Sequence, residues 1–178
     1  ESQLSTAELQ RGLNAALPED VAIVAVEEAR AGFHATYDAV AKTYRYQIHN
    51  GRTPDVFNRR YVWHYPQPLD AERMHAAAQA LVGKHDFSSF ESAGSERPDA
   101  VRTLFKLSVT RDADRITVEV TGDGFLYNMV RAIVGTLVEV GKGSRDVGWP
   151  AEVLAARDRR RAGQTAPPQG LFLVRVDY

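Results

Sequence analysis

Cysteine is absent from this chain of 178 residues, so disulfide bonds, thiolate zinc sites and cysteine nucleophiles are all excluded. An excess of either charge is also absent, because 22 basic and 23 acidic residues give a net charge of -1 at pH 7. Bulk charge therefore gives no argument for nucleic-acid binding, which would have to come from local clusters of Lys and Arg. A membrane-spanning run is absent too, since Arg131 interrupts the longest apolar stretch.

The motifs of several common enzyme classes are missing. None of the serines lies in the Gly-x-Ser-x-Gly elbow of hydrolases, and the five histidines lack the spacing of metal ligands, so we expect no metal site. Gly122-x-Gly124 lies between a predicted strand and a predicted helix, as a dinucleotide-binding fingerprint would. However, Tyr127 occupies the position of the third glycine, so the sequence predicts no dinucleotide site.

The length of 178 residues predicts one domain, residues 1–178, and periodic segments predict its helices and strands. Alternating apolar residues predict strands, and an apolar period of three to four residues predicts helices. The predicted helices are 5–14, 70–81, the apolar stretch between Gly124 and Gly141, and 150–161. The predicted strands are 21–26, 38–49, 103–109, 116–120 and 171–178, with loops at 51–68 and 85–98. Strands dominated by hairpins predict an α+β fold, with a mixed, mainly antiparallel sheet and helices packed on one face.

Residues suited to helix starts support three of these helices. Ser5 and Glu8 have the spacing of a capping box, and Asp70 is a good N-cap for the helix that contains Met74. Pro150 suits the first turn of the last helix.

Arg131 lies in the middle of the most apolar predicted helix. A buried guanidinium is costly unless an anion is held against it, so we expect a carboxylate or a phosphate to meet this side chain. A structural ion pair within the domain is the alternative to a functional site. Tyr127 lies one turn earlier on the same predicted helical face, so both side chains could line one pocket.

Three further segments carry residues suited to binding RNA. Residues 42–46 alternate cations and aromatics on a strand, which suits phosphate contact and base stacking, although a half-buried structural strand explains the pattern as well. Residues 83–90 place polar donors, among them His85, between aromatics, either as a ligand loop or as a loop anchored by Phe87 and Phe90. The basic run 157–161 is either a solvated helix end or a binding surface.

Taken together, several stretches resemble the tRNA pseudouridine synthase A family. One of them is Gly-Phe-Leu-Tyr-Asn-Met-Val-Arg at 124–131. The full set, in order along the chain, is 13–20, 33–35, 42–46, 83–90, 124–131 with 133–135, and 170–173. Each stretch is modest alone, but the series in this order is specific.

The resemblance implies an enzyme that isomerises uridine to pseudouridine in the anticodon arm of tRNA, at nucleotides 38 to 40. It also implies a cytoplasmic homodimer that needs no cofactor. Tyr44 matches the family tyrosine that stacks on the uracil, Arg131 matches the arginine that pairs with a catalytic aspartate, and Leu171 matches an apolar residue of the active-site wall. Substrate contacts are further expected from Lys42, Arg45, His85, Tyr127 and the basic run 157–161.

One departure from the family is serious, because no Arg-Thr-Asp-x-Gly-Val-His-like motif with the catalytic aspartate occurs in this chain. In the family this motif precedes the stretch that matches residues 13–20. The first residue, Glu1, is not Met, so we expect the C-terminal half of a synthase, without an N-terminal domain and inactive alone. The alternative is a non-catalytic module for RNA binding or dimerisation.

Overall fold

The computed structural model describes residues 3–94 and 99–178, which form two compact units. The first unit is Glu1–Asp38 and the second is Ala39–Tyr178. Every buried residue among those described belongs to the second unit, so the hydrophobic core and the sheet lie entirely in Ala39–Tyr178.

The first unit contains the helix α1, Thr6–Ala16, and the predicted capping box is confirmed. The Ser5 side chain accepts a hydrogen bond from the Glu8 backbone N–H, while the Glu8 carboxylate accepts one from the Ser5 backbone N–H at 2.8 Å. Two otherwise unpaired donors at the start of the helix are thereby satisfied.

The predicted strand 21–26 is wrong, because these residues form no ladder with another strand. Their backbone groups bind side chains of α1 instead. The Ile23 N–H donates to Asn14 Oδ1 at 2.7 Å, and the Asn14 amide donates back to the Ile23 carbonyl at 3.0 Å. Gln10 donates to the carbonyl of Val24 at 2.7 Å. The extended segment 21–26 thus forms its hydrogen bonds with side chains of α1 and not with another strand.

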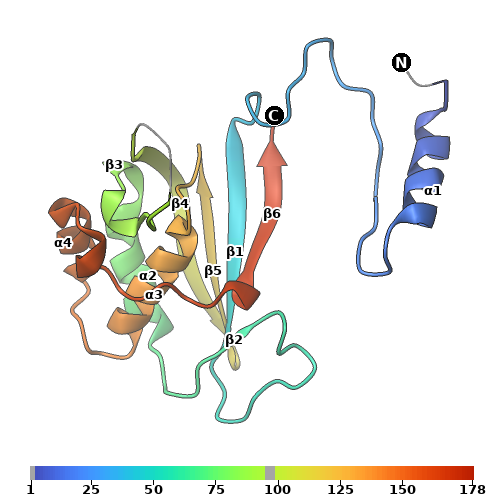
Figure 1. Cartoon of the computed structure of the whole chain (residues 1–178). Coiled ribbons are helices and arrows are strands. Elements are labelled where there is room, and N and C mark those ends of the chain that lie inside the picture. Colours follow the sequence, from blue (N-terminus) through green and yellow to red (C-terminus); the bar gives the residue numbers. More distant parts are fainter. Residues whose placement is uncertain (1–2, 95–98) are drawn as a thin grey trace. The chain divides into compact units, whose positions relative to one another are not determined.

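The second unit is built on a six-stranded sheet within the described residues (Figure 1). The strands are β1 (Ala41–His49), β2 (Trp63–His64), β3 (Gly83–Asp86), β4 (Val101–Asp112), β5 (Arg115–Gly122) and β6 (Leu171–Asp177). Their order is β2-β1-β5-β4-β3, and β6 pairs with β1. Only the short β1–β2 pairing is parallel, so the predicted mixed, mainly antiparallel sheet is confirmed.

Helices α2 (Ala71–Ala78), α3 (Met129–Gly141) and α4 (Trp149–Ala156) lie together on one face of this sheet (Figure 1). Asp70 caps α2 as predicted, accepting a hydrogen bond from the Arg73 N–H at 2.9 Å. The predicted extension of the last helix to residue 161 is wrong, because Arg157 adopts a left-handed conformation with φ of 48° and ends α4. None of the described helices is long and apolar enough to cross a membrane.

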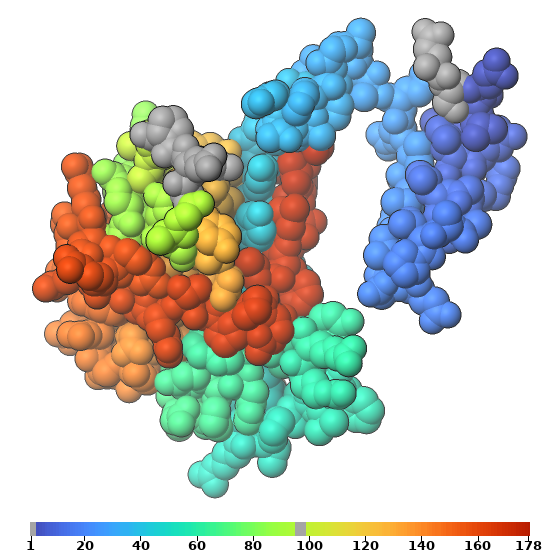
Figure 2. Space-filling view, viewed as in Figure 1, coloured from blue at the N-terminus to red at the C-terminus, as the bar shows by residue number. Residues whose placement is uncertain are grey.

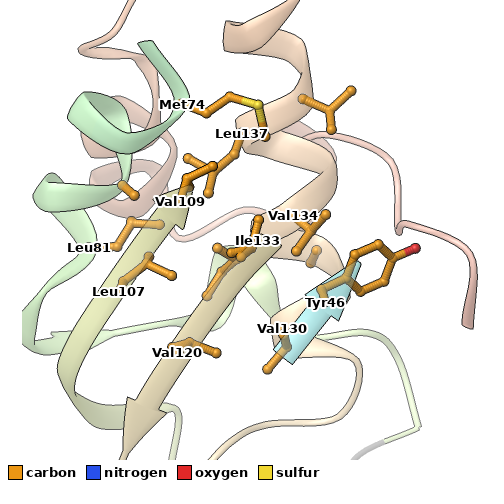
Figure 3. Packing of buried hydrophobic residues seen from close by; sticks show 14 of the residues in the cluster. Tyr46, Met74, Leu81, Leu107, Val109, Val120, Val130, Ile133, Val134 and Leu137 are labelled. Atoms are coloured by element: carbon orange, nitrogen blue, oxygen red, sulfur yellow. The ribbon is translucent and has the colours of Figure 1, made fainter. Parts of the chain in front are cut away.

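The core fills the space between α3 and the sheet (Figure 3). Along β5 every second residue is buried, and Val118 pairs with Tyr46 of β1 on the same face. Ile133 and Leu137 of α3 pack against this apolar face. The opposite face of β1 and β5 is polar, as the alternation of the sequence predicts.

Both predicted loops contain short strands. Residues 83–86 form β3, which pairs with β4, so the prediction that a loop begins at His85 is wrong. The turn Ser88–Phe90 follows, and the rings of Phe87 and Phe90 are fully buried, as expected for anchors. Residues 95–98 of that predicted loop lie outside the described ranges. In the loop 51–68, Trp63–His64 forms β2 beside the end of β1.

Candidate functional site

Arg131 lies in the first turn of α3, which begins later than the sequence suggested. Asn128 has a left-handed backbone with φ of 59°, which a right-handed helix cannot include, so α3 begins at Met129. Tyr127 therefore precedes the helix and its side chain is 58% exposed. The expectation that Tyr127 lies on the same helical face as Arg131 is wrong, because Tyr127 is not part of the helix. Instead, the Tyr127 carbonyl accepts a hydrogen bond from the Ser92 N–H at 3.0 Å.

The half-buried guanidinium of Arg131 is held by two neutral acceptors. Its Nε donates to the Ala166 carbonyl at 2.7 Å, and its Nη1 donates to Asn128 Oδ1 at 2.8 Å. Among the described residues, no carboxylate forms an ion pair with Arg131, and no acceptor is found for Nη2. The described residues thus orient the cation without cancelling its charge.

Residues 163–167, which we call the crossing segment, pack directly on α3. The Ala166 N–H donates to the Arg131 carbonyl at 3.1 Å, and the Gly163 N–H donates to Thr136 Oγ1 at 3.0 Å. A Cβ atom on Gly135 would lie 1.7 Å from the Gln164 carbonyl oxygen, so only glycine permits this approach. The orange-red chain between α4 and β6, which includes this segment, forms a continuous band in Figure 2.

Tyr46 links β1 to the crossing segment. Its buried hydroxyl donates to the Pro167 carbonyl at 2.6 Å, and the ring lies beside Val130 and Val134 of α3 (Figure 3). Burial raises the pKa of Tyr46 well above its usual range, although the nearby positive charge of Arg131 acts in the opposite direction. The phenol therefore remains protonated and keeps donating its hydrogen bond.

Tyr44 and Leu171 are neighbours of Tyr46, the first along β1 and the second across the β1–β6 ladder. Tyr44 is half-buried on the same face of β1, with its ring edge-to-face against Phe125 at a centroid distance of 5.0 Å. Leu171 pairs with Tyr46 across the β1–β6 ladder and packs against the core. The fold therefore gathers three of the predicted site residues, Tyr44, Arg131 and Leu171, around one buried phenol.

The predicted RNA contacts on β1 differ in their surroundings. Lys42 is half-buried on the face of Tyr44, in register with Gly122 of β5. Arg45 lies on the opposite, polar face, where its Nη2 pairs with Glu119 at 3.0 Å. The structure therefore separates Arg45 from the Tyr44 side chain.

Most of the remaining predicted contacts interact with neighbouring residues. His85 lies in β3 with its Nε2 3.0 Å from the Val82 carbonyl, so that nitrogen carries the proton. In the basic run, Arg157 pairs with Asp86, and Arg160 pairs with Asp158. Arg159 donates to the Gly163 carbonyl at 2.8 Å, and so supports the crossing segment. Within residues 3–94 and 99–178, no group of three or more His, Asp or Glu is arranged to hold a metal ion.

Sequence reasoning missed three groups at this site: the Asn128 side chain, the Ala166 carbonyl and the Tyr46 hydroxyl. Asn128 could have been noticed, because residues three apart at the start of a helix can interact. The other two had no signal in the sequence, since they depend on a segment more than thirty residues away from Arg131 in the chain.

Comparison with known proteins identifies the family of this chain. A family model described as tRNA pseudouridine synthase matches residues 77–178. The chain is 47% identical over 175 residues to the tRNA pseudouridine synthase A of Geobacillus sp. (strain WCH70), with 98% of the chain and 71% of that relative covered.

Two further relatives carry the same name. The protein of Brevibacillus brevis (strain 47) is 51% identical over 166 residues, with 93% of the chain and 68% of that relative covered. The protein of Thermoanaerobacter sp. (strain X514) is 41% identical over 177 residues, with 99% and 72% covered. These matches confirm the expected family: the chain belongs to the tRNA pseudouridine synthase family.

Proposed function

We propose that this chain is the part of a tRNA pseudouridine synthase that carries Tyr44, Arg131 and Leu171. The substrate is a uridine in the anticodon arm of tRNA, at nucleotides 38 to 40, and the product is pseudouridine. The main support is the guanidinium of Arg131, which neutral acceptors orient while its charge stays available for an anion. The names of the relatives support the reaction and the class of substrate.

In this proposal Arg131 binds the carboxylate of the catalytic aspartate. A guanidinium fixed by two hydrogen bonds presents its remaining N–H groups in a defined direction, which suits a charge-assisted pair with a carboxylate. The positive charge keeps the aspartate ionised, as its action on the sugar requires. Arg131 thus prepares the catalytic group without touching the base.

Tyr44 and Leu171 would form the part of the pocket that receives the uracil. The target nucleotide must leave its stack, because its glycosidic carbon is unreachable inside a helix. Tyr44, supported from the side by Phe125, then stacks on the base, and Leu171 closes the wall. The bond between uracil N1 and the sugar breaks, the uracil turns, and its C5 bonds to the same sugar carbon. C5 then loses its proton to solvent and N1 gains a proton, so the reaction is redox-neutral and needs no cofactor.

We further propose that the catalytic aspartate is supplied by a part of the enzyme outside this chain. The family motif that carries the aspartate does not occur in the sequence. The chain covers 71% and 68% of two relatives, which leaves residues in those proteins for such a segment. The chain would then be the C-terminal part of the synthase, larger than the half expected from the sequence.

Incubation with a tRNA transcript containing uridine tritiated at carbon 5 tests both proposals, because pseudouridine formation releases that tritium. The chain alone should release none, whereas the chain joined to the upstream part of its reading frame should release tritium from nucleotides 38 to 40. Product from the chain alone would refute the external aspartate. An inactive longer protein would refute the proposed reaction.

Substitutions in the longer protein test the two roles separately. Arg131→Lys should lower kcat by about 100-fold or more, because an ammonium cannot reproduce the fork of the guanidinium. Tyr44→Leu should also lower turnover, through loss of stacking on the uracil. Arg175→Lys, an equally conservative change on exposed β6, is the matched control and should leave kcat within about twofold of the wild type.

We also propose that the protein acts in the cytoplasm as a homodimer on which the anticodon arm lies. Lys42, on the same strand face as Tyr44, is the basic residue best placed to contact the tRNA backbone. Lys42→Ala should weaken tRNA binding and reduce its dependence on salt, measured by filter binding from 50 to 200 mM NaCl.

Sedimentation equilibrium should give twice the mass of one chain, and a monomer would contradict the proposed assembly.

A further inference from the structure

Asn128 has an unusual backbone and an unusual use of its side chain. Its φ of 59° is left-handed, a conformation that non-glycine residues other than Asn and Asp rarely adopt. It occupies the N-cap of α3, yet its side chain makes no capping hydrogen bond to that helix. Asn at such a position usually accepts from a backbone N–H. Here Oδ1 accepts from Arg131 Nη1 at 2.8 Å instead.

We propose that Asn128 is a positioning residue for the reaction. Its amide oxygen holds the Arg131 guanidinium in the direction that the catalytic carboxylate requires, and its neutrality leaves the charge of Arg131 intact. This inference rests on the proposed function and adds to it a residue that touches neither the base nor the aspartate.

The argument depends on the difference between an amide and a carboxylate at this position. Aspartate has nearly the same shape, tolerates the same left-handed backbone and is an equally good N-cap residue. Its negative charge also suits the N-terminus of α3. However, an ionised carboxylate in place of Oδ1 would pair with Arg131. The catalytic aspartate would then meet a cation that is already neutralised and a second negative charge.

Glycine at this position makes the complementary change. It adopts a positive φ without strain, so the start of α3 is preserved. It removes the acceptor for Arg131 Nη1, so the guanidinium keeps only its bond to the Ala166 carbonyl. Asn128→Gly therefore loosens Arg131, whereas Asn128→Asp holds Arg131 and cancels its charge.

The test is to measure kcat, KM and melting temperature for both variants in the longer protein that contains this chain. Asn128→Asp should lower kcat by about 100-fold, with KM within threefold and the melting temperature not lowered. Asn128→Gly should lower kcat by about tenfold, because misdirection of a charge costs less than its loss. Gln169→Glu adds the same charge on an exposed residue and is the matched control, with kcat unchanged.

The outcomes separate this inference from the proposed function. Wild-type protein that forms no pseudouridine defeats the proposed function. Active wild-type protein together with an Asn128→Asp variant whose kcat is within threefold of wild type defeats only the role of Asn128. If both variants are destabilised to the same extent and lose kcat together, the role of Asn128 is purely structural. That result also defeats the inference.

Discussion

Tyr44 and Tyr46 lie two residues apart on one face of β1, and their hydroxyl groups have different surroundings. The Tyr46 hydroxyl is buried and donates to the Pro167 carbonyl, whereas the Tyr44 hydroxyl has no hydrogen bond to any residue in the described ranges. A buried carbonyl that loses its donor costs more than an exposed one, because water cannot replace the bond. The same chemical change should therefore have different effects at the two positions.

Tyr46→Phe should lower the free energy of unfolding by about 1–2 kcal/mol, because the half-buried Pro167 carbonyl loses the donor that the buried Tyr46 supplies. Tyr44→Phe is the matched control and should change it by less than about 0.5 kcal/mol. Urea denaturation followed by circular dichroism measures both. Equal losses in the two variants would contradict the role given to the Tyr46–Pro167 hydrogen bond.

At the residue scale, the sequence identified the cation but not its partners. Arg131 was conspicuous because a charge within an apolar helix is costly, and the alternation of β1 placed Tyr44 and Tyr46 on one face. The expectation of an anion beside Arg131 did not include the backbone carbonyl and the side-chain amide that also bind this guanidinium. Ala166 offers only its carbonyl, which every residue type carries, so no residue pattern could have indicated it.

At the scale of elements, the backbones of α3 and the crossing segment lie so close together that no Cβ atom fits between them at Gly135. Gly135 and Gly163 face each other there, and a Cβ atom on Gly163 would lie 2.7 Å from the Gly135 carbonyl oxygen. This contact brings the Ala166 carbonyl to Arg131. The position of the guanidinium therefore depends on two glycines that carry no functional group.

Gly135→Ala should destabilise the protein by about 3 kcal/mol or more, because backbone atoms rather than flexible side chains block the new methyl group. Gly148→Ala, at a position with no atom within 4 Å, is the control and should change stability by less than about 0.5 kcal/mol. Thermal unfolding by calorimetry measures both. A Gly135→Ala protein as stable as the wild type would contradict the close approach of the two backbones.

Asp86 connects β3 to the turn Ser88–Phe90 and to the end of α4. Its carboxylate accepts hydrogen bonds from the Ser88 hydroxyl and from the Ser88 N–H at 3.0 Å, and it pairs with Arg157 Nε at 3.2 Å. The Ser88 hydrogen bonds, with a smaller effect of Arg157, hold the pKa of Asp86 below its usual range. A lowered folded pKa gives stability that is present above the unfolded pKa and lost as pH falls through the folded value.

Wild-type protein should therefore be more stable than Asp86→Asn at pH 7, and this difference should shrink as pH falls below about 4, the usual pKa of an aspartate. Urea denaturation of both proteins at pH 7 and pH 3 measures the difference. Asp112→Asn is the control, since no described residue donates a hydrogen bond to that carboxylate. A difference that grows toward acidic pH would contradict the sign of the shift.

Helices and strands were predictable from the sequence where the signal lies in their own residues. The capping box of α1, the Asp70 cap and the alternation of β4 and β5 are local signals, and these elements are confirmed. Residues 21–26 and 83–86 were misassigned, because a strand exists only where another strand pairs with it. The sequence of Val21–Val26 has strand composition without a partner, and β3 has a polar composition with β4 as its partner.

At the scale of the whole molecule, the second unit holds every buried residue among those described. A protein consisting of residues 39–178 should therefore unfold cooperatively, with a free energy of unfolding within about 1 kcal/mol of the whole chain. That difference corresponds to about 4 °C or less in melting temperature. Calorimetry of both proteins decides this, and a non-cooperative transition for 39–178 would show that the core needs residues 1–38.

The double attachment of Arg131 to Ala166 has a consequence for dynamics. The Arg131 carbonyl accepts from the Ala166 N–H and the Arg131 side chain donates to the Ala166 carbonyl, so a motion that carries Ala166 away from α3 breaks both hydrogen bonds. Exchange of the Ala166 amide proton with deuterium therefore measures how often this opening occurs and the guanidinium is released. If Arg131 has the proposed role, residue-resolved exchange rates would measure, without any substrate, how often the site loses its correctly placed guanidinium.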